Sequence, residues 1–204
     1  MGSCSGIICV IYVKYLVYTS RGETCRTEVY PEEGYVIKRF VPRKAKFGRP
    51  IDALRGSLDL SFYREKECLS RLLGSQHFPQ IIDHNKHDLW IKMSYVGENY
   101  EKAVIDDTQK YQLQVDNIIQ TLADKKIKLA YEWRPGDNRM GYCLSMMMFK
   151  ENIMSLIDFE RAWPVGCDRE AEFGSLFVES FSKHDNTKFK DVLKKTISML
   201  HEKK

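Results

Sequence analysis

A chain of 204 residues is long enough for one domain or two small lobes. Its content of 43% hydrophobic and 12% aromatic residues excludes a wholly disordered protein. The formal net charge of +4 comes partly from basic residues at 39–49 and 194–204, without the dense basic stripe of a nucleic-acid-binding protein. Six scattered cysteines with no C-x-x-C pair predict free thiols, which are typical of a reducing compartment. No run reaches the roughly 18 apolar residues of a membrane span, so we expect a cytoplasmic protein without a transmembrane segment.

The first third of the chain has the alternating pattern of β-strands. Three runs show it, "KYLVYTS", "CRTEVYP" and "YVIKRF", and Gly34 supplies the permissive backbone for a turn between the second and third. We therefore predict a hairpin of these two runs.

Residues 52–74 follow with a helical pattern. Phe62, Leu69 and either Leu72 or Leu73 recur at helical spacing, and Gly74 closes the segment. A helix packed on the preceding strands is the expected result.

The remainder of the chain mixes both periodicities. Strands are predicted at 79–85 and 89–96, a helix at 107–126, an irregular loop at 127–141, a hairpin of 142–149 with 153–159, and helices at 169–182 and 189–204. For the helix at 107–126 the expected apolar face consists of Leu113, Ile118, Ile119 and Leu122. This order of elements predicts an α+β protein.

Two charged residues fall on predicted apolar faces. Lys38 alternates with apolar residues on its strand, and a lysine on the inward face must be paired or bind an anion; a solvated edge lysine is the alternative. Glu65 lies one helical turn before Leu69 and could supply the pairing carboxylate. Glu67 is rotated by about 200° from Glu65 around the helix axis, so only one of the two can face the strands.

Hard oxygen donors cluster in two later segments. Glu132, Asp137 and Asn138 in "YEWRPGDN" could provide a base and a ligand for Mg²⁺, or could simply build a turn. Asp158 ends an apolar run, where a carboxylate is costly unless it is hydrogen-bonded in the structure or holds a cation. In this order, a lysine, a glutamate and metal-binding oxygens match what phosphoryl transfer requires.

These elements, taken in order, resemble the protein-kinase-like fold. "YVIKRF" is similar to the V-A-I-K strand of that family, "REKECLSRL" to its first large helix and "LWIKMSYVGENY" to the strand that leads into the adenine-binding hinge. "SLIDFERAW" resembles the metal-binding D-F-G element, with Glu160 in place of glycine as in choline-kinase-like and aminoglycoside-phosphotransferase-like enzymes. The resemblance extends from about Leu16 to about Phe181.

The resemblance implies roles for the nucleotide-binding residues. Lys38 would hold the α- and β-phosphates of ATP, Glu65 would orient Lys38, and Asp158 would bind Mg²⁺. Tyr95 and Val96 would lie at the hinge and offer backbone hydrogen bonds to adenine. The resemblance also implies a glycine-rich loop at the first hairpin.

The catalytic and glycine-rich loops depart from the family pattern. "GETCRTEV" keeps only Gly22 of the three glycines. "AYEWRPGDN" has no aspartate at the H-R-D position, so Glu132 would take the place of the base. Asp137 would occupy the position of the metal-binding asparagine, or Asn138 would do so after a shift of one residue.

The expected architecture is therefore bilobal. Residues 1–96 would form a sheet-rich N-lobe with one large helix, and residues 97–204 a reduced, mainly helical C-lobe. The expected function is a divergent ATP- and Mg²⁺-dependent phosphotransferase acting on a protein or small-molecule hydroxyl. The alternatives are an inactive pseudokinase that binds a kinase or another protein partner, and an unrelated α+β protein.

Overall fold

The computed structural model describes residues 15–17, 25–41, 51–100, 102–129, 145–173 and 186–202, and the side chains of these ranges except 15–17 and 51–57. Its first elements are β1 (Tyr15–Val17), β2 (Cys25–Tyr30), β3 (Tyr35–Phe40), α1 (Ile51–Arg71), β4 (Ile81–Asn85) and β5 (Trp90–Ser94). They are followed by β6 (Glu98–Asn99), α2 (Thr108–Asp124), β7 (Ile127–Lys128), β8 (Met147–Lys150), β9 (Ile153–Leu156), β10 (Trp163–Pro164), the 3₁₀ helix η1 (Glu170–Phe173) and α5 (Thr187–Glu202).

The first five strands form one antiparallel sheet in the order β1-β2-β3-β5-β4. The predicted hairpin of β2 and β3 is confirmed. Its turn is closed by a hydrogen bond of 3.2 Å from the Gly34 amide to the Pro31 carbonyl, and Gly34 has a φ of 75°, which favours glycine. Lys38 of β3 lies opposite Ile91 of β5, a fully buried residue, so Lys38 is on the interior face of the sheet.

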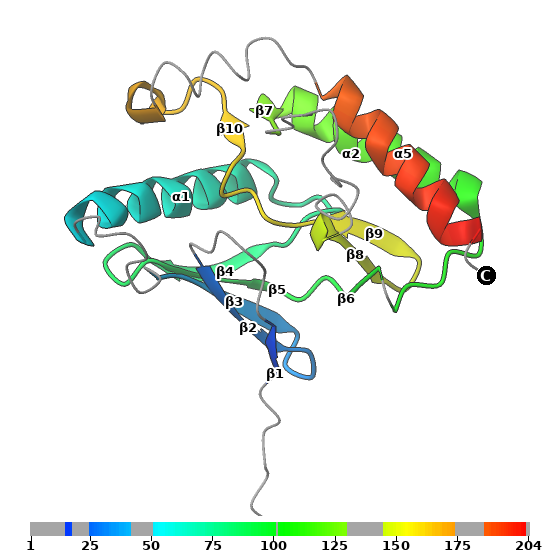
Figure 1. The fold of residues 1–204 in the computed structure, drawn as a ribbon, viewed down its shortest axis with the longest axis horizontal. Helices are drawn as coiled ribbons and strands as arrows, with labels where there is room; N and C mark the ends of the chain where they lie inside the picture. The colour runs from blue at the N-terminus through cyan, green and yellow to red at the C-terminus, as the bar shows by residue number, and fades with distance from the viewer. Residues whose placement is uncertain are drawn as a thin grey trace, which may run out of the picture.

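Helix α1 covers the interior face of this sheet, as Figure 1 shows. Phe62, Leu69 and Leu72 are buried, which confirms the predicted helical stripe, whereas the Leu73 side chain is 54% exposed. Phe62 contacts Phe40 of β3 edge to face, with ring centroids 5.7 Å apart. The helix therefore lies directly against the strand that carries Lys38.

Helix α2 agrees with its predicted range, but its predicted face is partly wrong. Asp107 caps the helix by accepting a hydrogen bond from the Lys110 amide. Leu113 is 58% exposed, because it lies about 140° around the helix from Ile118. The buried stripe instead consists of Tyr111, Val115, Ile118 and Leu122.

Strands β8 and β9 form the predicted second hairpin, shorter than expected. Glu151 and Asn152 at its tip have φ values of 50° and 68°, the left-handed geometry of a two-residue hairpin turn. This hairpin is joined to the segment between α1 and β4. The Leu156 amide donates to the His77 carbonyl at 2.9 Å, and His77 Nδ1 donates to the Met154 carbonyl at 2.8 Å.

Residues 127–141 were predicted to form an irregular loop, and this prediction is wrong for the first two residues. Ile127 and Lys128 form β7, which pairs with β10. Ile127 is 1% exposed, so the pairing satisfies backbone groups that are buried with this side chain. The Asn186 side chain extends the edge, since its Oδ1 accepts from the Leu129 amide and its Nδ2 donates to the Ile127 carbonyl.

Helices α2 and α5 lie side by side beyond the second hairpin (Figure 1). The predicted C-terminal helix is confirmed as α5, with Phe189, Leu193 and Ile197 buried. The predicted helix at 169–182 is described only to residue 173, where it forms η1. The described ranges thus contain an antiparallel sheet and three α-helices, which confirms the α+β class.

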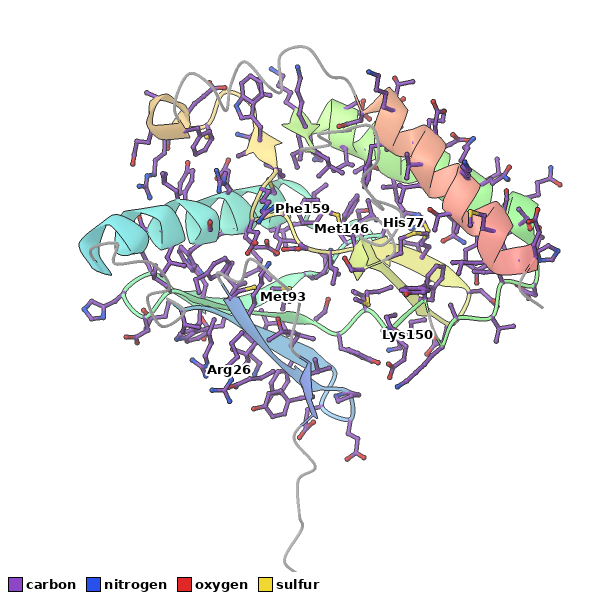
Figure 2. The ribbon with its side chains drawn as sticks, viewed as in Figure 1. Arg26, His77, Met93, Met146, Lys150 and Phe159 are labelled. Atoms are coloured by element: carbon purple, nitrogen blue, oxygen red, sulfur yellow. The ribbon has the colours of Figure 1, made fainter. Side chains whose placement is uncertain are left out.

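The interior is continuous between the sheet, α1 and the second hairpin. In Figure 2, Phe159 and Met146 lie in the middle of the molecule, whereas Arg26 lies on the sheet face away from α1. Within the described ranges no helix has the length and apolar character needed to cross a membrane. Cys25, Cys68 and Cys167 are free thiols, as predicted.

Candidate functional site

The site is centred on the ammonium group of Lys38. Its Nζ lies 3.0 Å from Oε2 of Glu65, 2.7 Å from Oδ1 of Asp158 and 3.6 Å from Oε2 of Glu160. The Lys38 side chain is only 8% exposed. Strand β3 delivers the lysine to the interior because its neighbours Val36 and Phe40, two residues away on each side, face the core.

Helix α1 supplies Glu65 from a position three residues after Phe62 and four before Leu69. Because both of these apolar residues are buried, the helix turns Glu65 inward, where the residue is 1% exposed. Glu67 instead pairs with Arg71 at 2.9 Å, one turn later on the same helix. Of the two glutamates considered from the sequence, the structure places Glu65 at the lysine.

Asp158 follows β9 and has an unusual backbone conformation. Its φ is 73°, in the left-handed region that aspartate tolerates better than most residues. The next residue, Phe159, is fully buried and contacts Phe78 with ring centroids 5.9 Å apart. The Asp158 side chain remains 33% exposed, so its carboxylate faces both Lys38 and solvent.

Glu160 also belongs to this cluster, although it was not predicted from the sequence as a site residue. It is 8% exposed, and its backbone carbonyl accepts a hydrogen bond of 2.7 Å from Arg64 Nε of α1. Carboxylates on both sides of a buried phenylalanine, at 158 and 160, were the signal available in the sequence.

The cluster places three carboxylates around one ammonium group. Burial raises the pKa of Glu65 to about 7, against the opposing effect of Lys38. Burial alone would lower the pKa of Lys38, but Asp158, Glu65 and Glu160 together raise it well above its usual value. Lys38 is therefore charged, and three carboxyl groups surround it.

Cys25, at the start of β2, lies in the field of the same cluster. Burial raises the pKa of its thiol to about 12, with Lys38 opposing. This thiol is therefore neutral at physiological pH and adds no charge to the site.

The predicted hinge residues lie directly after β5. The Tyr95 amide donates to the Gly34 carbonyl at 2.9 Å, so this N–H group is already used. The Tyr95 hydroxyl donates to Glu98 at 2.9 Å. Among the described residues the Val96 amide has no hydrogen-bond partner. Gly97 next to it is buried, with a φ of 113° and the Phe149 backbone against its Cα.

Four predicted site residues lie outside the described residues: Gly22, Glu132, Asp137 and Asn138. In the part of the chain that the structure describes, no three His, Cys, Asp or Glu side chains are arranged to hold a metal ion. Mg²⁺ is commonly held by one or two carboxylates, with phosphate and water oxygens as the other ligands. The partly exposed Asp158 carboxylate fits such a site.

The fold resembles that of solved structures. A WbdD structure with the kinase inhibitor LY294002 aligns at 13% identity and a TM-score of 0.48, over 89% of this chain and 44% of that chain. Rio2 kinase from Chaetomium thermophilum, in an ADP/Mg²⁺-phosphoaspartate complex, aligns at 15% identity and a TM-score of 0.47, over 91% of this chain and 62% of that chain. A high-resolution crystal structure of WbdD aligns at 12% identity and a TM-score of 0.50, over 91% of this chain and 45% of that chain.

The chain has a protein-kinase-like fold. The match to WbdD at a TM-score of 0.50 carries this conclusion, which concerns the fold and not the activity. The chain spans 45% of that WbdD chain and 62% of the Rio2 chain. No protein-family profile and no curated protein matches the sequence.

Proposed function

We propose that this kinase-like chain binds ATP with Mg²⁺ at the Lys38 cluster and transfers the γ-phosphate to a hydroxyl group of a protein or small molecule. The observation that carries the proposal is the position of Lys38, 3.0 Å from Glu65 and 2.7 Å from Asp158. A buried lysine held by a helix glutamate next to a partly exposed carboxylate is an arrangement suited to a nucleotide phosphate and its metal ion.

The difference in exposure between Glu65 and Asp158 supports this assignment. Glu65 is nearly inaccessible and keeps Lys38 in place, whereas Asp158 has access to solvent. In the proposed complex Asp158 would be a ligand of the cation, and Lys38 would donate to the α- and β-phosphate oxygens. Mg²⁺ would neutralise negative charge on the phosphates. Glu160 remains as a second carboxylate near the ammonium group.

The hinge and the loops complete the proposed site. The Val96 amide would donate to the adenine ring, since the Tyr95 amide is paired with Gly34. Gly22 would allow the first loop to approach the phosphates. We assign residues 1–96 to an N-lobe and 97–204 to a C-lobe, with the nucleotide between them.

The catalytic step is assigned to the segment 127–141. Glu132 would accept the proton of the acceptor hydroxyl, and Asp137 or Asn138 would be the second ligand of the metal. Glutamate can act as a general base if its carboxylate lies within hydrogen-bond reach of that proton.

An inactive pseudokinase is the second candidate function. The specific observation in its favour is the sequence "AYEWRPGDN", which lacks the aspartate of the H-R-D element, together with the loss of two glycines near Gly22. This candidate binds nucleotide or a protein partner without transferring phosphate.

Thermal unfolding with and without Mg-ATP tests nucleotide binding. A ligand at 100 times its Kd stabilises the folded state by about 2.7 kcal/mol. We expect a rise in melting temperature for the wild type and for Lys102→Ala, which changes an exposed lysine, and none for Asp158→Ala. Absence of a shift for the wild type at millimolar Mg-ATP would contradict the proposal.

Transfer of radiolabelled phosphate from ATP then separates the two candidates. An active enzyme incorporates label into itself or an added acceptor, and Lys38→Ala and Glu132→Gln abolish this. A pseudokinase shows the Mg-ATP-dependent stabilisation without any labelled product or ADP release.

A further inference from the structure

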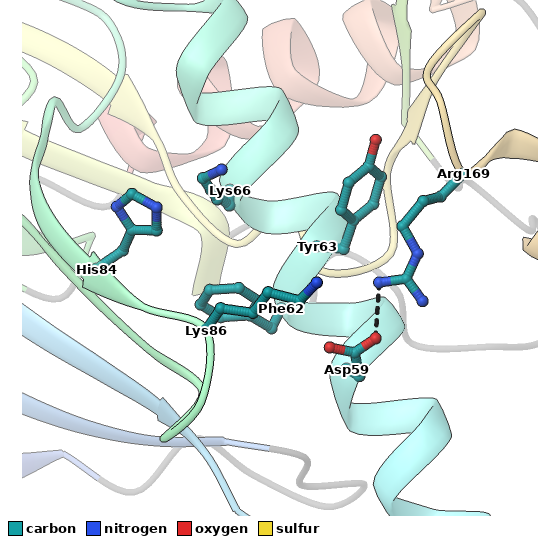
Figure 3. A pocket seen from close by; sticks show the side chains of 7 residues that line it. All are labelled: Asp59, Phe62, Tyr63, Lys66, His84, Lys86 and Arg169. Carbon is teal, nitrogen blue, oxygen red and sulfur yellow. Dashed lines mark hydrogen bonds and ion pairs between the residues drawn. The ribbon is translucent and has the colours of Figure 1, made fainter.

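A pocket lies beside helix α1, next to β4 and the turn that follows it (Figure 3). Its volume is about 190 Å³, and it is formed where α1, the turn between β4 and β5, and the segment before η1 meet. The residues that line it are Asp59, Phe62, Tyr63, Lys66, His84, Lys86 and Arg169.

Three positively charged side chains line the pocket, and two of them, Lys66 and Lys86, could bind a ligand. Arg169 is committed, because it pairs with Asp59 at 2.6 Å and with Glu172, and its guanidinium lies 5.0 Å from the centre of the Tyr63 ring. Lys66 and Lys86 form no hydrogen bond and no ion pair with any residue that the structure describes; the pKa of Glu172 is lowered mainly by Arg169 and in part by the charge of Lys86. Two like charges that share one pocket favour an anionic ligand between them.

The pocket also has an aromatic wall. Phe62 is only 2% exposed, because its ring packs edge to face on Phe40, so half-buried Tyr63 is the aromatic side chain that a ligand can contact. The guanidinium of Arg169, which also lines the pocket, lies over the Tyr63 ring. Benzene fills an apolar cavity of about 150 Å³, so a volume of about 190 Å³ accommodates one aromatic ring with a small substituent.

We propose that this pocket binds the phosphate monoester of an aromatic ring. The ring packs against Tyr63, and the phosphate lies between Lys66 and Lys86. A phosphate monoester carries about two negative charges at neutral pH, which matches the two available ammonium groups. This site does not depend on the proposed nucleotide site, because none of its lining residues belongs to the Lys38 cluster.

Isothermal titration of the full chain with phenyl phosphate, phenol and inorganic phosphate tests the proposal. Phenyl phosphate should bind at least tenfold more tightly than either of the others. The double variant Lys66→Ala/Lys86→Ala should lose at least tenfold in affinity. Lys188→Ala/Lys195→Ala removes the same charge from exposed positions on α5 and should stay within twofold of the wild type.

Three results would overturn the proposal: no binding of phenyl phosphate, equal binding by both double variants, or equal affinity for phenyl and inorganic phosphate. Lys86→Ala alone, at an exposed turn, provides a folded variant if the pocket double variant fails to fold. N-acetyl-phosphotyrosine amide identifies the source of the group. Tighter binding than phenyl phosphate indicates a phosphotyrosine side chain, and weaker binding indicates a free aryl phosphate.

Discussion

The ammonium group of Lys38 lies 2.7 Å from the carboxylate of Asp158, although 120 positions separate them in the sequence. Together with Glu65 and Glu160, this pair joins β3, α1 and the segment after β9 through one buried charge cluster. The stability of the fold and the proposed chemistry of the site therefore rest on the same lysine.

Replacing Lys38 by methionine should destabilise the protein strongly. The variant keeps the volume of the side chain but leaves buried carboxylates without their counterion, which costs about 3 to 5 kcal/mol. Urea denaturation measures this loss as a lower midpoint. Lys102→Met removes a surface ion pair with Glu98 and should cost less than about 1 kcal/mol. Equal losses for the two variants would show that the Lys38 cluster does not contribute in this way.

The buried carboxyl of Glu65 should make stability depend on pH. Its pKa is raised from 4.5 to about 7, chiefly by burial, so between these values the folded state binds more protons than the unfolded state. The free energy of unfolding should therefore fall as the pH rises from 4.5 to 7. Glu65→Gln should flatten this part of the profile, and Glu67→Gln, which breaks the pair with Arg71, should keep it. An unchanged slope in Glu65→Gln would contradict the assignment.

Substitutions of Asp158 should separate its backbone role from its carboxylate. Asp158→Ala and Asp158→Gly both remove the carboxylate, but alanine is strained at a φ of 73° and glycine is not. We expect the glycine variant to be more stable than the alanine variant by about 1 kcal/mol in chemical denaturation. Both should lose the stabilisation by Mg-ATP. A glycine variant that retains it would remove Asp158 from the metal site.

Gly97, next to the proposed hinge, should not accept a side chain. A Cβ at this buried residue would collide with the backbone of Phe149, and its φ of 113° is unfavourable for alanine. Gly97→Ala should cost about 3 kcal/mol or more. Gly166 has a φ of 71° with open space around it, so Gly166→Ala should cost only about 1 kcal/mol. Thermal unfolding of the two variants tests whether the collision, in addition to the backbone angle, determines the loss.

The sequence predicted those parts of the fold whose signals are local. The hairpin of β2 and β3 follows from alternation and from Gly34 in its turn, and the inward position of Glu65 follows from its helical spacing to Phe62 and Leu69. Leu113 was assigned to the wrong face of α2, because the spacing of Tyr111 and Val115 to Ile118 defines the buried stripe.

Features that depend on tertiary contacts had no such signal. Strands β7 and β10 have two residues each, and they form only because the chain brings Ile127 and Pro164 together. Glu160 belongs to the lysine cluster through the path of the chain after Phe159 and its hydrogen bond with Arg64. The pocket beside α1 likewise combines this helix with Arg169, which is distant in the sequence.

The two hydrogen bonds of His77 have a mechanical consequence. They attach the β8–β9 hairpin, and with it the start of the segment that carries Asp158, to the connection between α1 and β4. The position of Asp158 relative to α1 is therefore set by backbone attachment as well as by its ion pair with Lys38. Removing the imidazole, as in His77→Ala, would cut one of these two attachments and leave the ion pair as the main link between β3 and the segment after β9.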